Sequence, residues 1–234
     1  MLFKELGCLF FSAGCISLYW WWITGRFHGQ NQHTNTAHLR RPSIPYTNRL
    51  IRNAWVNALG QAPGADILAV QTLRNAIMVA SALASATILT LLGAFTLLAQ
   101  NEILLRVINH LTTLLPNLVP NTPDLAQWLE LKLLMLGVLQ LLAFYSFLTA
   151  IRYYGHVSFL VTIPQALRVQ SLTADPQANV DVLPAYLQRA GDAYSIGLRL
   201  FLFSIPIFAW LLGNPALLAT TGGLLILMYL TDRH

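Results

Sequence analysis

Long apolar runs constrain this chain more than any other feature of its sequence. They cover residues 6–23, 76–99, 133–151, 195–212 and 214–230. Each run has about the 17 to 25 residues that a helix needs to cross the hydrocarbon of a bilayer. Only 10% of the residues are charged, whereas an ordinary soluble domain has roughly a quarter. The sequence therefore predicts an all-α fold: a polytopic membrane helix bundle with five transmembrane helices and amphipathic interfacial helices.

The first apolar run resembles a secretory signal but lacks a small-residue cleavage site after it. It ends in an aromatic cluster, Tyr19 to Trp22, of the kind that lies at a membrane interface. We interpret residues 1–25 as a signal-anchor transmembrane helix. The rest divides into residues 26–64, a cytoplasmic loop with an interfacial helix, and residues 65–234, a four-helix membrane domain.

Two segments outside the apolar runs have amphipathic patterns. In residues 49–59, apolar positions alternate with Arg52, Asn53 and Asn57, which predicts a helix lying on the inner membrane face. Residues 102–115 predict a second interfacial helix, on the outer side. The helix that follows Pro63-Gly64 is expected to run unbroken from residue 65 to 99.

Arginines give the expected orientation. They gather before the second run and around the loop between the third and fourth, and only Arg106 lies in the loop between the second and third. By the positive-inside rule, the first two regions are cytoplasmic. We therefore expect a multi-pass protein of the inner (plasma) membrane with its N-terminus outside and its C-terminus in the cytoplasm.

Three arginines stand at the cytoplasmic ends of three spans: Arg74, Arg152 and Arg199. Because guanidinium groups offer planar bidentate donors, they are candidates for an anion or lipid head-group site, with anionic lipids of the inner leaflet as partners. The alternative is that each arginine independently reaches the interface and anchors its own helix. A shared site requires the three arginines to lie at one depth.

Polar residues near the middle of the spans form a second candidate set: Thr87, Gln140, Ser204 and Thr221. One interpretation is interhelical hydrogen bonding combined with close packing at small-residue pairs such as Ala80/Ala84 and Ser81/Ser85. The other is a narrow polar path for an ion or small solute.

The chain lacks the motifs that most often carry catalysis or metal binding. It contains no GxGxxG, P-loop, HExxH, CxxC or GxSxG sequence, and no acidic residue is central in a span. We therefore expect no enzyme activity, no catalytic residues, no metal site and no cofactor. The net charge of +5 comes from basic residues flanking apolar runs, which indicates contact with lipid and not with nucleic acid.

Several short segments resemble one family. They are Gln71 to Asn75, Ala84-Ser85, Glu130 to Lys132, Ile151 to Tyr153 and Tyr194 to Arg199. In order and spacing these segments are similar to a family of bacterial and plant membrane proteins catalogued only as a domain of unknown function. The likeness covers residues 48–231. It implies a multi-span inner-membrane protein with no known activity, and it places Lys132 and the three span-end arginines at the family's recurring charged positions.

These features favour a non-enzymatic membrane protein that acts by assembly, as a homo-oligomer or as an accessory subunit of a larger membrane complex. The alternative is a channel or facilitator for an anion or small solute. An enzyme acting on a lipid or quinone is the third hypothesis.

Overall fold

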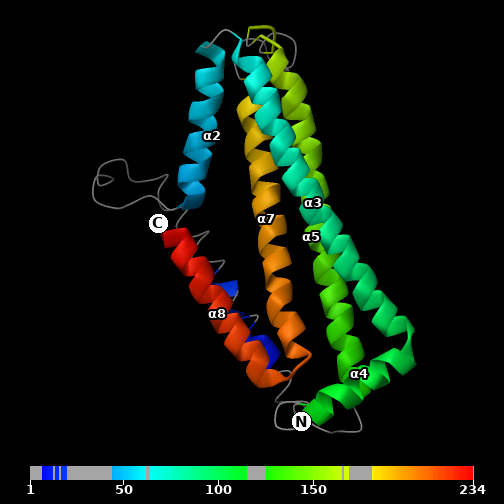
Figure 1. Cartoon of the computed structure of the whole chain (residues 1–234). Helices are drawn as coiled ribbons and strands as arrows, with labels where there is room; N and C mark the ends of the chain where they lie inside the picture. The colour runs from blue at the N-terminus through cyan, green and yellow to red at the C-terminus, as the bar shows by residue number, and fades with distance from the viewer. Residues whose placement is uncertain are drawn as a thin grey trace. The chain divides into compact units, whose positions relative to one another are not determined.

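The computed structural model describes residues 7–12, 14–15, 17–19, 44–61, 64–114, 125–164, 166–168 and 181–233. The described helices are α2 (Ile44–Gln61), α3 (Ala65–Ala99), α4 (Asn101–Leu114), α5 (Leu125–Thr162), α7 (Leu183–Trp210) and α8 (Asn214–Arg233) (Figure 1). Among these residues, four helices are long and apolar enough to cross a membrane: α3, α5, α7 and α8. A shorter apolar helix, Gly7–Tyr19, covers part of the first expected span. The first expected span, and with it the total of five, thus stays a prediction, since the rest of that run lies outside the described residues.

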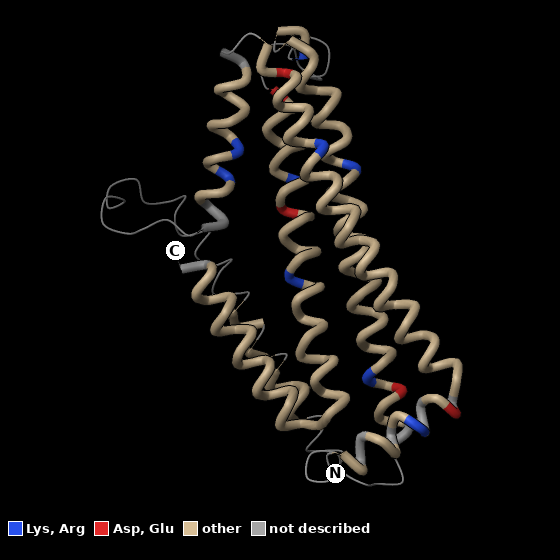
Figure 2. The backbone as a smooth tube through the Cα atoms, viewed as in Figure 1, with Lys and Arg blue, Asp and Glu red and all other residues tan. Residues whose placement is uncertain are grey.

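Two helices extend beyond the expected spans. The third apolar run, residues 133–151, lies within a helix of 38 residues, and the fourth begins twelve residues after the start of α7. At 1.5 Å per residue, α3 and α5 are about 52 and 57 Å long, against roughly 30 Å of hydrocarbon. Apolar runs mark the part of a helix that suits lipid, whereas the helix itself continues through charged residues, shown in Figure 2.

The chain forms two compact units. Unit 1 contains residues 1–47, 92–139 and 202–234, and unit 2 contains residues 48–91 and 140–201. Unit 2 therefore combines most of α2 with the larger part of each of α3, α5 and α7.

The core of unit 2 has two apolar clusters. In one, Val56 of α2 is grouped with Leu73, Val157, Leu183 and Leu187 of the three long helices. In the other, Ala84 of α3 packs with Ala143 and Phe147 of α5, flanked by α7 residues. Helices α5 and α7 approach closely at Gly197, where an added Cβ would lie 3.0 Å from the ring of Phe147.

The core of unit 1 joins the remaining parts of these helices to α8 and to the N-terminal segment. Ala94 of α3 is grouped with Leu129, Leu133 and Leu136 of α5. A separate cluster of Phe203, Leu224 and Met228 takes in Tyr19 of the first apolar run. The N-terminal helical segment is therefore part of the packing of unit 1.

A tight turn joins the last two helices, α7 and α8. Gly213 has a φ of 129°, which favours glycine, and its N–H donates to the carbonyl of Trp210 at 3.1 Å. Helix α8 begins at the next residue, Asn214. Pro206 lies inside α7, which continues as one helix to Trp210.

Candidate functional site

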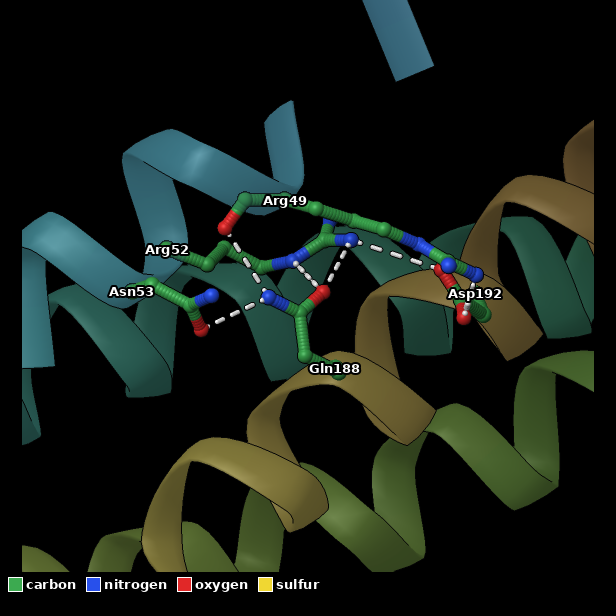
Figure 3. A network of polar contacts seen from close by, with 5 residues as sticks. All are labelled: Arg49, Arg52, Asn53, Gln188 and Asp192. Atoms are coloured by element: carbon green, nitrogen blue, oxygen red, sulfur yellow. Dashed lines mark hydrogen bonds and ion pairs between the residues drawn. The ribbon is translucent and has the colours of Figure 1, made fainter. Parts of the chain in front are cut away.

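A polar network joins α2 to α7 within unit 2 (Figure 3). Arg49 Nη2 donates to Asp192 Oδ2 at 2.6 Å. Arg52 donates from Nε and Nη2 to Gln188 Oε1, at 3.0 and 2.8 Å. Gln188 Nε2 in turn donates to the Arg49 carbonyl at 2.9 Å and to Asn53 Oδ1 at 3.0 Å. The amide of Gln188 thus contacts both the backbone and the side chains of α2.

Helical spacing explains why these residues meet. Gln188 and Asp192 are four residues apart on α7, and Arg49, Arg52 and Asn53 are three and four apart on α2, so each set shares one helix face. The polar side of α2 is therefore directed at α7, whereas the amphipathic pattern alone is typical of a helix whose polar side meets solvent. The expected position of α2 on the inner membrane face stays a prediction.

Gly191 provides the space for the Arg52 guanidinium. A Cβ on Gly191 would overlap the Nη1 and Cζ atoms of Arg52. Since Gly191 lies between Gln188 and Asp192 on the buried side of α7, any larger residue there displaces Arg52 from its hydrogen bonds.

The charges of the network are unequal, with two guanidinium groups for one carboxylate. Burial lowers the pKa of Arg52, and the nearby charge of Asp192 acts in the opposite direction. The Arg49 and Asp192 side chains are 48% and 39% exposed, so their ion pair is worth at most about 1 kcal/mol. The network therefore sets the register of α2 on α7, while Trp55 and Val56 supply the apolar contacts.

A second, buried ion pair joins the end of α5 to the start of α7. Arg168 Nη2 and Asp181 Oδ2 are 2.7 Å apart, and the two side chains are only 7% and 12% exposed. Arg168 also donates to the carbonyls of Leu160 and Ile163 at the C-terminal end of α5. Asp181 Oδ1 accepts the N–H of Leu183 in the first turn of α7. The pair thus caps one end of each helix.

Hydrogen bonding controls the pKa of Asp181. Burial alone raises this pKa, but the hydrogen bonds from Arg168 and from the Leu183 N–H, together with the charge of Arg168, lower it by more. The pKa therefore lies below the ordinary value of 3.8, and Asp181 is ionised at neutral pH.

Lys132 is buried in unit 1, with 3% of its surface exposed. Its Nζ donates to the Trp210 carbonyl at 3.1 Å and lies 4.7 Å from the centre of the Trp210 ring. The Trp210 indole N–H donates to Asn214 Oδ1 at 2.9 Å. A cation at the C-terminal end of α7 is favoured by the helix dipole, so Lys132 stabilises the turn between α7 and α8.

Two of the span-end arginines, Arg152 and Arg199, lie at different levels of unit 2. Arg74 and Arg152 are exposed and Arg199 is half-buried. Gly197 of α7 lies level with Phe147 of α5. From that level, Arg152 is five residues further along α5, and Arg199 is two residues further along α7, in the opposite direction. Seven residues correspond to about 10 Å along the bundle. The expected shared depth therefore does not hold for this pair, and the anion or lipid head-group site stays a prediction.

All four mid-span polar residues are buried: Thr87, Gln140, Ser204 and Thr221. Within unit 1, the Thr221 hydroxyl lies 3.5 Å from that of Ser12 in the N-terminal segment. Within unit 2, the Thr87 hydroxyl donates to the Ala84 carbonyl at 2.7 Å. The amide of Gln140 has no hydrogen-bond partner on either atom among the described residues.

Four long apolar helices, uncharged over most of their length, define the class: a multi-pass α-helical membrane protein. A family model described as a protein of unknown function, DUF599, matches residues 9–234, and the chain belongs to this family. The match confirms the resemblance found in residues 48–231 and extends it through the N-terminal segment. No curated protein matches the chain, and no solved structure matches it.

Proposed function

We propose that this protein acts by assembly in the inner membrane, without catalysis of its own, as a homo-oligomer or as an accessory subunit of a membrane complex. The observation that carries the proposal is the outward face of α3. Its candidate span is 17% buried, against 22% to 33% for the other three described spans. Of the small-residue pairs predicted for close packing, Ala80/Ala84 is used inside unit 2, whereas Ser81/Ser85 is not.

The two small-residue pairs of α3 differ in burial. Ala80 and Ala84 are 0% and 5% exposed and belong to the interior of unit 2. Ser81 and Ser85 are exposed, and the Ser85 hydroxyl donates to the Ser81 carbonyl at 3.0 Å. A face with small side chains and an internally satisfied hydroxyl allows another helix to approach closely in lipid. The partner proposed for it is α3 of a second copy.

Cysteine crosslinking in native membranes tests this contact. In a Cys8→Ser/Cys15→Ser background, Ser81→Cys and Ser85→Cys should form disulfide-linked dimers on mild oxidation. Val79→Cys is the matched control, since Val79 is 50% exposed but lies on another side of α3. Crosslinks to a different protein would favour the accessory-subunit form. Absence of crosslinks at both serines, or equal crosslinking at Val79, would contradict a specific α3 contact.

The second candidate function is a channel or facilitator for an anion or small solute. It is favoured by the buried amide of Gln140, which has no hydrogen-bond partner among the described residues, since a solute path needs polar groups inside the bundle. Liposome flux separates the two functions. If purified protein gives no more permeability to chloride, nitrate, small neutral solutes or water than empty liposomes, this second candidate is wrong.

A further inference from the structure

Gln140 is a polar side chain in the middle of an apolar helix. It is 0% exposed, and neither Oε1 nor Nε2 has a hydrogen-bond partner in the part of the chain that the structure describes. A buried amide without partners is costly in a protein interior, and more so at membrane depth, where bulk water does not compensate. Most such groups in native proteins are satisfied by protein or by bound water, so Gln140 requires a partner.

The packing of α3 on α5 brings Thr87 into the neighbourhood of Gln140. Ala84 of α3 belongs to the same buried cluster as Ala143 and Phe147 of α5, and the two helices run in opposite directions. Three residues further along α3 is Thr87, and three residues back along α5 is Gln140. Residues three apart share a helix face, so Thr87 and Gln140 lie on the sides of α3 and α5 that meet in this cluster, within about one turn of the same level. Both side chains are 0% exposed.

The hydrogen-bonding capacity of the two side chains defines what fits between them. The Thr87 hydroxyl uses its proton in the bond to the Ala84 carbonyl, which leaves its oxygen as an acceptor. Gln140 offers one acceptor oxygen and an NH₂ donor. A cation cannot accept from the NH₂ group, and an anion cannot donate to the two oxygens. The required ligand is a small neutral molecule that donates two hydrogen bonds and accepts one.

We propose that a water molecule is bound between Thr87 and Gln140. It donates to Thr87 Oγ1 and to Gln140 Oε1, and it accepts from Gln140 Nε2. Such a bridge is nearly as favourable in enthalpy as a direct hydrogen bond and fixes the register of α3 on α5 at mid-span. The proposal is independent of assembly, because both residues lie within unit 2 of one chain.

A double-mutant cycle tests the bridge in detergent. Thr87→Val keeps the shape of the side chain and removes the oxygen, while Gln140→Leu removes the amide. Each should lower Tm by about 2–4 °C, the shift expected for one lost hydrogen bond in a chain of this size. The double variant should lose no more than the larger single loss, because either substitution breaks the same bridge. Thr90→Val is the control, since the hydroxyl of Thr90 donates to the Ala86 carbonyl of its own helix and has no other hydrogen-bond partner among the described residues.

Water-edited solid-state NMR of the protein in nanodiscs gives a direct readout. The Gln140 side-chain amide signal, assigned by its loss in Gln140→Met, should receive magnetisation from water in the parent and much less in Thr87→Val. No transfer in the parent would overturn the proposal, as would a Gln140→Leu variant that raises Tm. A direct hydrogen bond between Thr87 and Gln140 detected in the same spectra would also overturn it.

Discussion

The Asp181→Asn substitution tests how far the buried ion pair holds α5 and α7 together. Asparagine keeps the size of the side chain and an oxygen for the Leu183 N–H, but it leaves Arg168 buried without its counter-charge. Removing one partner of a buried pair costs about 3–5 kcal/mol. Because Arg168 retains the carbonyls of Leu160 and Ile163, we expect the lower end, about 3 kcal/mol, and a Tm lower by about 6–12 °C.

The control for this prediction is Asp66→Asn, which removes an exposed carboxylate from the first turn of α3. It should cost at most about 1 kcal/mol, the size of a helix-dipole interaction at the surface. The assay is thermal unfolding in detergent at neutral pH. If Asp181→Asn and Asp66→Asn melt at the same temperature, the ion pair does not stabilise the chain as argued.

The same pair predicts a pH dependence. The pKa of Asp181 is lower in the folded protein than its ordinary value of 3.8. The stabilisation from Asp181 is therefore present above about pH 4 and is lost as the pH falls through the folded-state pKa. The Tm difference between the parent and Asp181→Asn should be constant from pH 5 to 7 and shrink below about pH 4. A difference that is unchanged at pH 3 would contradict the assignment.

Three further predictions concern other parts of the chain. Gly191→Ala should displace the Arg52 guanidinium and increase deuterium exchange along α2, while Gly93→Ala, which meets no atom within 4 Å, should leave α2 unchanged. If Arg199 binds an anionic head group, Arg199→Lys should lower Tm, because lysine lacks the bidentate fork, and excess phosphatidylglycerol should restore it. An unchanged Tm would leave Arg199 as a helix anchor. For the orientation, single cysteines at Asn35, Asn121 and Asn179 should react with an impermeant thiol reagent in intact cells only at Asn121, and labelling of Asn35 would reverse the topology.

Helix type was predictable from the sequence, and helix length only partly so. The prediction that α3 runs unbroken from residue 65 to 99 is confirmed, because Pro63-Gly64 gives a clear start and no breaker follows. For α5 and α7, the apolar runs are shorter than the helices that contain them. Charged residues such as Arg152 and Asp192 do not break a helix; they only end its lipid-compatible part, so hydropathy alone does not locate the helix ends.

Charged contacts were the least predictable part of the candidate site. From the sequence, Arg49 and Arg52 were interpreted as topology signals. Their contacts with α7 were not predictable, because a single sequence does not say whether the polar face of an amphipathic helix meets water or another helix. The spacing of Gln188 and Asp192 is the signal that could have indicated a polar face on α7. The contact between Arg168 and Asp181 follows no helical spacing in the sequence, because it depends on how the chain returns from α5 to α7.

The central claim, that this membrane protein works by assembly, is tested most directly by native mass spectrometry after mild extraction into nanodiscs. The account predicts a species at a multiple of the 26.0 kDa chain mass, or a complex of the chain with a second protein. Substitution of Ser85 by a bulky residue, Ser85→Trp, should convert a homo-oligomer to the single chain, while the control Val79→Trp should not. A parent protein found only at 26.0 kDa, with no co-purifying protein, would contradict the claim.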